Sequence, residues 1–164
     1  MNYLQFEITL QEVPGEISLC FSITGCTLHC NDCHSPLLWK KENGALLSIE
    51  IFNNILTKYQ GFATCVLFMG GEWYEKKLIK LLKIALRKEY KTCLYSGEEN
   101  ISPSILSHLN WIKTGKWDSE KGGLNNQKTN QKFIHVKTNT IHNHLFQKNN
   151  SNDSINRKTS NKKN

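Results

Sequence analysis

The chain has 164 residues, of which 38% are hydrophobic and 21% are charged, and its formal net charge is +7. This length suits one domain of ordinary size and is too short for a complete eightfold barrel of about 250 residues. The composition is that of a folded chain, and no apolar run approaches the roughly 20 residues of a membrane-spanning helix. The first residues lack the basic and apolar segments of a signal peptide, so we expect a cytoplasmic protein without membrane contact.

The pattern of apolar residues predicts strands and helices in alternation. Strands are expected at residues 3–10, 17–23, 63–69, 92–96, 111–113 and 133–136. Helices are expected from Ser48, which caps the first, to about Gly61, and at residues 72–90 and 103–109. A long loop, residues 24–47, precedes the first helix. Because strands and helices alternate with short connections, the pattern predicts an α/β fold with a mostly parallel sheet of about six strands.

The six cysteines are unevenly placed along the chain. They are too few for a disulfide scaffold of this length. Three of them are scattered among apolar residues and are expected to fill the core: Cys20, Cys65 and Cys93. The other three fall on the long loop, where a cluster of thiols in a reducing compartment indicates metal or redox chemistry.

The clustered cysteines, Cys26, Cys30 and Cys33, have the spacing C-x3-C-x2-C. Three thiolates on one short loop can bind a 4Fe-4S cluster and leave one iron open to a small molecule. On spacing alone, three alternatives stay open: a zinc site that adds His29 or His34, a thioredoxin-like pair of Cys30 and Cys33, and a loop without a metal. Zinc sites more often bring a second C-x2-C pair, and a redox pair leaves Cys26 unexplained.

Polar residues and glycines follow the later strands. Gly70, Gly71 and Glu72 come directly after the strand at residues 63–69, and Ser96 and Lys113 end the next two strands. Ligands of α/β sheets bind beyond the carboxyl ends of strands. Two glycines there would let a ligand reach the backbone, and a carboxylate beside them can hold an ammonium group. In isolation the same residues form only a turn, in which Glu72 favours the positive end of the next helix.

Together, the cysteine motif and Gly70-Gly71-Glu72 resemble the radical S-adenosylmethionine superfamily. Within it, three further stretches resemble the activating proteins of anaerobic ribonucleoside-triphosphate reductases: residues 33–39 (CHSPLLW), 111–115 (WIKTG) and 122–133 (GGLNNQKTNQKF). The resemblance covers roughly residues 1–137. It implies that the sheet forms an open partial (β/α) barrel. The domain is expected to span residues 1–146, because the composition changes after them.

The resemblance also implies a ligand set. Cys26, Cys30 and Cys33 would ligate a 4Fe-4S cluster, and the amino and carboxylate groups of S-adenosylmethionine would chelate its fourth iron. Gly70, Gly71 and Glu72 would hold the methionine amino group. The further cofactor contacts implied are Asp32 (through its backbone), Cys33, His34, Ser96 and Lys113.

The implied reaction is reductive cleavage of S-adenosylmethionine to methionine and a 5′-deoxyadenosyl radical. That radical would take a hydrogen atom from a glycine of the large reductase subunit, and a flavodoxin-like protein would donate the electron. Alternatives within the class are an activase of another glycyl-radical enzyme and another small radical enzyme of this type. The alternative from a different class is a zinc-binding module that docks nucleic acid.

The end of the chain, residues 147–164, differs in composition from the rest. It holds five Lys or Arg against one Asp, is rich in Asn and Ser, and has Ile155 as its only large hydrophobic residue. Such a segment cannot bury enough apolar surface to fold, so we expect a disordered basic tail. Because the tail carries +4 of the net charge and leaves +3 for the rest, the charge of the domain does not predict direct binding to nucleic acid.

Overall fold

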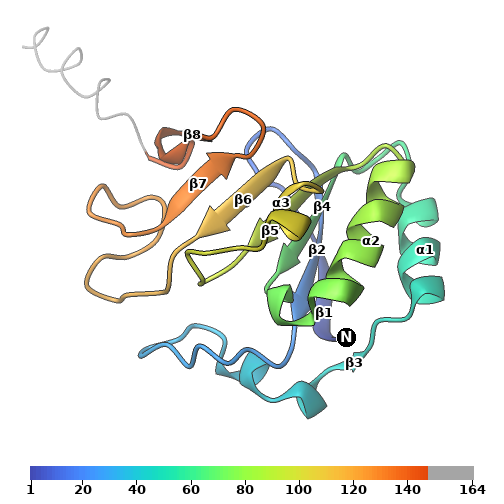
Figure 1. Cartoon of the computed structure of the whole chain (residues 1–164), viewed down its shortest axis with the longest axis horizontal. Coiled ribbons are helices and arrows are strands. Elements are labelled where there is room, and N and C mark those ends of the chain that lie inside the picture. Colours follow the sequence, from blue (N-terminus) through green and yellow to red (C-terminus); the bar gives the residue numbers. More distant parts are fainter. Residues whose placement is uncertain (148–164) are drawn as a thin grey trace, which may run out of the picture.

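A single sheet runs through the computed structural model, which describes residues 1–147 (Figure 1). Within this range eight strands follow the order β3-β1-β2-β4-β5-β6-β7-β8. Their bounds are β1 (Asn2–Thr9), β2 (Ser18–Ile23), β3 (Ala45–Leu46), β4 (Cys65–Met69), β5 (Lys91–Tyr95), β6 (Trp111–Thr114), β7 (Lys132–His135) and β8 (Thr140–Ile141). The tail expected at residues 147–164 lies, except for Gln147, outside the described residues.

Three α-helices and four short 3-10 helices complete the described part. They are α1 (Ile49–Lys58), α2 (Glu75–Arg87), α3 (Pro103–Leu106), η1 (Pro36–Trp39), η2 (Lys41–Asn43), η3 (Glu72–Tyr74) and η4 (Asn143–Leu145). The predicted cap of the first helix is confirmed, because the Ser48 hydroxyl accepts a hydrogen bond from the Ile51 N–H at 3.1 Å. Across residues 1–147, no helix has both the length and the apolar character needed to cross a membrane.

The expectation of an open partial barrel with a mostly parallel sheet of about six strands is wrong. Four of the seven neighbouring pairs in the described sheet are antiparallel: β1–β2, β1–β3, β6–β7 and β7–β8. A parallel pair needs a crossover connection, usually a helix, whereas an antiparallel pair needs none. Residues 10–17 and 115–131, which are all described, contain no helix, so β2 and β7 return antiparallel to the strands before them.

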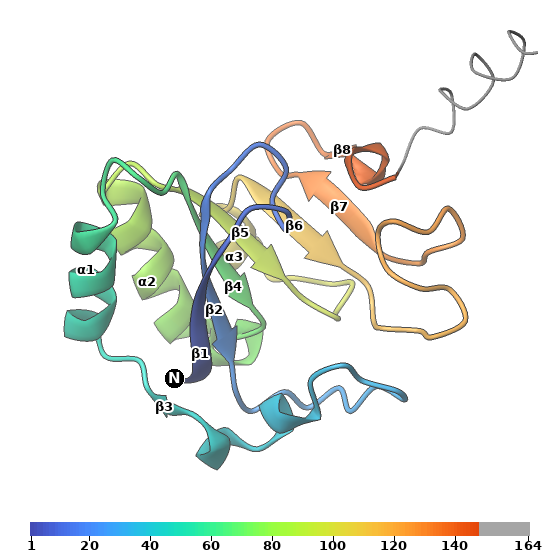
Figure 2. The same ribbon diagram turned by 180° about the vertical axis from the view of Figure 1, so that it is seen from behind.

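The sheet packs on both faces. The larger core lies between the sheet and the helices α1 and α2, which cover one face (Figures 1 and 2). At its centre the ring of Phe21 lies 5.3 Å from that of Phe52 and 5.6 Å from that of Phe68. The smaller core, on the opposite face, contains the three scattered cysteines. Burial raises the pKa of Cys20 and of Cys65 to about 12, so these thiols stay neutral, as expected of residues that fill a core.

Replacing Leu82 by alanine should lower the free energy of unfolding by about 2–5 kcal/mol, because this side chain is fully buried between α2 and the sheet. Leu86, one turn later, is 39% exposed, so Leu86→Ala should cost less than about 1 kcal/mol. Urea denaturation followed by circular dichroism compares the two variants. Equal losses would contradict the packing of α2 described above.

Candidate metal centre

The ends of four parallel strands form one edge of the sheet. The register of β2, β4, β5 and β6 places Ser22, Met69, Tyr95 and Lys113 side by side in a row. The loops that leave β2, β4 and β5 at this row carry the clustered cysteines, the segment of residues 70–72 and Ser96. The topology therefore brings the predicted site residues to the same edge of the sheet, where α/β sheets bind ligands.

The loop after β2 holds the clustered cysteines and is folded back on itself. The N–H groups of Gly25 and Cys26 both donate to the Leu38 carbonyl, at 2.7 and 3.0 Å. Gly25 has a φ of +94°, and a Cβ atom built there would lie 2.7 Å from the Tyr74 hydroxyl. Glycine is therefore required for the turn into the cysteine loop.

The three thiols are near one another, but their sulfur atoms do not converge on one point. Cys30 is buried, Cys26 and Cys33 are half-buried, and all three are free. The pKa of Cys26 is raised mainly by burial and further by Glu72, Cys30 and Cys33, which all lie close enough to act on it. Within residues 1–147, no three Cys, His, Asp or Glu side chains converge closely enough to hold a metal ion. The chemistry of the donor set still fits a thiolate-bound cluster, because the three thiols share one loop and none is used in a disulfide.

The two histidines on which a zinc site would depend pack against tryptophans. His29 stacks on Trp39 with ring centroids 4.7 Å apart, and His34 tilts against Trp117 at 4.1 Å. Packing against these tryptophans accounts for the positions of both imidazole rings. These contacts give no support to the zinc alternative.

The two glycines after β4 form a turn that residues with side chains could not adopt. Gly70 and Gly71 have φ angles of +79° and +110°, which side chains rarely adopt. A Cβ atom on Gly70 would lie 2.5 Å from the Trp73 ring, and one on Gly71 would lie 3.3 Å from Ile23. The backbone can therefore follow this path only without side chains at the two positions.

Glu72, the first residue of η3, has a largely enclosed carboxylate. Its Oε1 atom accepts a short hydrogen bond from the Ser96 hydroxyl. Its Oε2 atom is buried and has no hydrogen-bond partner among the described residues. Burial raises the pKa of Glu72, and the bond from Ser96 opposes this shift. One oxygen is thus held in place while the other lacks a donor.

Lys113 brings a buried cation to the same place. Burial lowers its pKa to about 8, while Cys30 and Glu72 act in the opposite direction. Its Nζ atom lies 5.8 Å from the centre of the Tyr95 ring. No ion pair within 4.0 Å links Lys113 to Glu72 in the described part of the chain, because the ion pairs found there are Lys91–Glu16 and Lys121–Asp118.

The side chains of Asp32 and His34 point towards the loop between β6 and β7. Asp32 accepts a hydrogen bond from the Ser119 hydroxyl at 2.9 Å and lines a separate pocket, whereas His34 meets Trp117. The structure therefore does not bring the Asp32 side chain to Glu72. Ser119 and Trp117 are contacts that the sequence pattern does not predict, although Trp117 follows closely on the carboxyl end of β6, where such residues could be sought.

Buried polar atoms without partners are concentrated at this edge of the sheet. Seven such side-chain atoms occur among the described residues, and five belong to side chains around the site: Trp39, Glu72, Trp73, Trp117 and Asn130. Folded proteins pair nearly all of their buried polar groups. This concentration indicates a place where a ligand supplies the missing partners.

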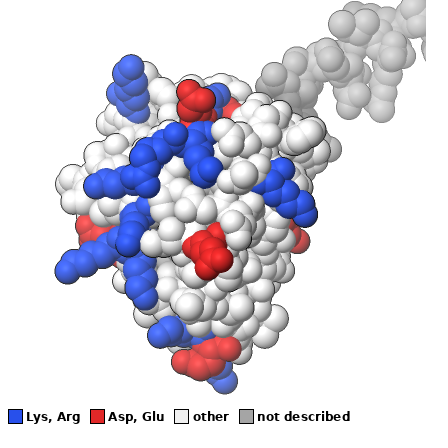
Figure 3. Space-filling view, turned by 90° about the vertical axis from the view of Figure 1, so that its right-hand side faces the viewer, with Lys and Arg blue, Asp and Glu red and all other residues white. Residues whose placement is uncertain are grey.

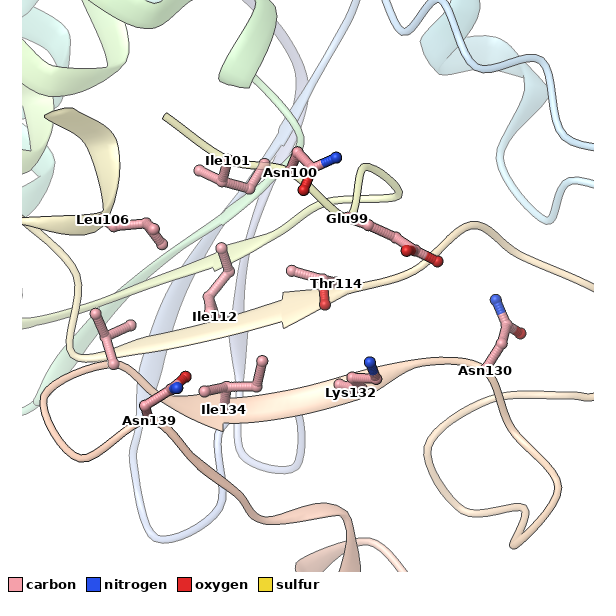
Figure 4. Close-up of a pocket in the computed structure, with 11 residues that line it drawn as sticks. Glu99, Asn100, Ile101, Leu106, Ile112, Thr114, Asn130, Lys132, Ile134 and Asn139 are labelled. Carbon is pink, nitrogen blue, oxygen red and sulfur yellow. The ribbon is translucent and has the colours of Figure 1, made fainter. Parts of the chain in front are cut away.

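Besides the pocket at Asp32, two cavities border candidate ligands, and a third lies along β6 and β7. One of about 430 Å³ lies on the face opposite α1 and α2 and is lined by Cys33, His34, Tyr95, Lys113 and Trp117 among others. A smaller one of about 260 Å³ lies between Leu28 and Glu72. The third, of about 400 Å³, runs along β6 and β7, with an apolar floor that includes Ile112 and Ile134 and with Glu99, Asn130 and Lys132 towards one end (Figure 4).

A comparison with protein families adds evidence that is independent of this geometry. The family model described as "4Fe-4S single cluster domain" matches residues 14–133, which include the cysteine loop and all the other candidate ligands. The chain therefore belongs to the family of 4Fe-4S single cluster domains. It is an iron–sulfur protein that binds one such cluster. Searches of curated proteins and of solved structures found no match.

The burial of Glu72 predicts a pH-dependent effect of Glu72→Gln on stability. The folded-state pKa lies above the ordinary value of 4.5, so ionisation costs the folded state more than the unfolded state. The wild-type protein should therefore lose stability as the pH rises from 4.5 through the folded-state pKa, and the glutamine variant should not. The difference in unfolding free energy should grow in favour of the variant as the pH rises above about 4.5. Urea denaturation of the cluster-free protein measures this difference in unfolding free energy. A difference independent of pH would contradict the burial of the Glu72 carboxylate.

Proposed function

We propose that this iron–sulfur protein is a radical S-adenosylmethionine enzyme that activates an anaerobic ribonucleoside-triphosphate reductase in the cytoplasm. The observation that carries the proposal is the buried Oε2 atom of Glu72, which lacks a donor beside a cysteine loop that suits a cluster. The resemblance of the sequence motifs supports the particular reaction.

Cys26, Cys30 and Cys33 are the proposed cluster ligands. Three cysteines leave one iron of a 4Fe-4S cluster without a protein ligand, which suits a cluster that binds a small molecule. The raised pKa of Cys26 means that this thiol is protonated in the metal-free chain. Cluster binding should therefore release protons from the loop as thiolates form.

Glu72 and Lys113 are the proposed contacts of the amino-acid end of S-adenosylmethionine. Each is ionisable, largely buried and without an ion-pair partner among the described residues. A zwitterion with its ammonium on Glu72 and its carboxylate on Lys113 would give both groups the opposite charge that the fold does not provide. Ser96 holds Glu72 in position, and Gly70 and Gly71 allow the tight turn that leads into it.

The bound cluster and S-adenosylmethionine would supply a one-electron cleavage of the sulfonium carbon–sulfur bond and, through it, the removal of a hydrogen atom from a glycine of the partner. The chain positions this chemistry through the residues above. The cavity of about 430 Å³ beside Cys33 is the proposed entry for a segment of the large reductase subunit. A flavodoxin-like protein is the proposed electron donor.

Single replacements Cys26→Ala, Cys30→Ala and Cys33→Ala should each abolish cluster assembly, because each removes one of three proposed iron ligands. The matched control is Cys65→Ala, whose thiol lies in the smaller core. Iron and acid-labile sulfide are measured after anaerobic reconstitution. A cluster that survives Cys30→Ala, or that is lost from folded Cys65→Ala, would contradict the ligand assignment.

Glu72→Gln should weaken the binding of S-adenosylmethionine about ten- to a hundredfold, since a charge-assisted hydrogen bond contributes roughly 1.5–3 kcal/mol. The iron content should be unchanged. Glu75→Gln is the control, because Glu75 accepts a hydrogen bond from Ser102 instead. Equilibrium binding to the reconstituted proteins gives the affinity of each variant for S-adenosylmethionine. An unchanged affinity for Glu72→Gln would show that Glu72 serves only as the first residue of η3.

Formation of the glycyl radical tests the particular partner. The reconstituted protein, reductant and S-adenosylmethionine are mixed with the purified large reductase subunit, and the radical is followed by electron paramagnetic resonance. A glycyl signal on that subunit supports the proposal. Cleavage of S-adenosylmethionine without any such signal would assign the enzyme to a different protein substrate.

A further inference from the structure

The outer side of α2 carries a row of cations that the candidate site does not use. The α2 cation row consists of five exposed residues: Lys76, Lys77, Lys80, Lys83 and Arg87. The helix α2 itself, residues 75–87, has a net charge of +4, whereas residues 1–147 as a whole have +3. Figure 3, which views the side of the molecule that carries α1, shows Lys and Arg side chains gathered over much of it and fewer Asp and Glu.

This row costs the isolated protein stability. Lys76 and Lys80 are four residues apart, as are Lys83 and Arg87, and like charges at that spacing on a helix repel each other. Lys77 and Lys76 also lie in the first turn, where the positive end of the helix dipole disfavours cations. Neither of the two ion pairs found in residues 1–147 involves the row. A row of cations that the fold leaves without acids is complementary to an acidic surface on a partner.

The row begins next to the candidate metal centre. α2 follows Glu72 through the single turn of η3. The pKa of the Met1 amine is lowered to about 6 by burial and then by Lys77 and Lys41, so both lysines lie near that amine. The Lys41 carbonyl accepts a hydrogen bond from the Thr24 hydroxyl at 3.1 Å, at the start of the cysteine loop. The cationic surface therefore extends from α2 to the base of that loop.

The row and the cavity of about 430 Å³ lie on opposite faces of the sheet. α2 packs on the larger core, whereas the cavity borders Tyr95, Leu124 and Phe146 of the smaller core. A protein docked on the row leaves the cavity open to a substrate. The partner that must reach the cysteine loop while a substrate occupies the cavity is the one that delivers electrons.

We propose that the α2 cation row, together with Lys41, docks an acidic protein that donates single electrons to the cluster. This inference rests on the proposed function only in requiring an external donor. One electron leaves the reduced flavin of the donor, which is oxidised to its semiquinone, and is received by the cluster without transfer of any atom. The row draws the donor to the side of the cysteine loop that faces away from the cavity.

The test uses the double variant Lys80→Glu with Lys83→Glu. It should fold, because the new acids stand four residues from Lys76 and Arg87 and convert repulsion into attraction. The control variant, Lys128→Glu with Lys137→Glu, makes the same change in charge at exposed positions outside the helices. The probe is a purified bacterial flavodoxin, and its association rate with each protein is measured at low and at physiological ionic strength.

The α2 variant should associate at least about tenfold more slowly than wild type at low ionic strength, and its dependence on salt should be weaker. The control should keep the wild-type rate. Equal rates for wild type and the α2 variant, equal losses in both variants, or binding of RNA by the row without an effect on flavodoxin would each overturn the proposal. Two further measurements keep the proposals apart. Full reduction of the cluster by dithionite tests whether the cluster is intact. Cleavage of S-adenosylmethionine by the dithionite-reduced protein tests the proposed function.

Discussion

The parallel register of β2, β4, β5 and β6 is the constraint on which the site depends. It places Ser22, Met69, Tyr95 and Lys113 in one row, so the loops that follow leave the sheet at the same edge. Neighbouring strands lie about 4.8 Å apart, which brings residues distant in sequence within reach of one small ligand. The packing of α1 and α2 on the larger core holds this register. A slip of one residue in β4 would therefore displace Glu72 as well as reverse the two faces of the strand.

The electrostatics of the site follow from its enclosure. Burial raises the pKa of Glu72 and lowers that of Lys113, so it disfavours the charged form of both groups. The two groups favour each other's charge, yet they are too far apart to form an ion pair. Five of the seven unpaired buried polar atoms in the described chain surround the same place. At this edge of the sheet, buried charged and polar groups therefore lack partners that a charged, polar ligand would provide.

In the proposed account, the two faces of the sheet have different functions. The face opposite α1 and α2 offers a cavity next to Cys33, whereas the face that these helices cover presents cations that extend to the base of the cysteine loop. Both routes end at the same row of strand ends. A substrate and an electron donor could thus reach the cysteine loop at the same time from opposite sides.

The parts of the fold that local chemistry determines could be predicted from the sequence. The cap at Ser48, the buried strand β4 and the amphipathic helix α2 follow from single residues and periodicity. The direction of β7 could not be predicted in this way, because it depends on a long loop that forms no helix. β3 and β8 have two residues each and are too short for any periodic pattern. The clustering of the predicted ligands followed from strand order, whereas the contacts of Trp117 and Ser119 depend on the path of an irregular loop.

The most direct test of the central claim is the fate of S-adenosylmethionine on the reconstituted, dithionite-reduced protein. The account predicts that methionine and 5′-deoxyadenosine form in equal amounts, and that neither forms before reduction. Quantitative mass spectrometry of both products decides the matter. If S-adenosylmethionine is recovered intact while electron paramagnetic resonance shows a fully reduced 4Fe-4S cluster, the protein is an iron–sulfur protein of another kind and the proposed chemistry is wrong.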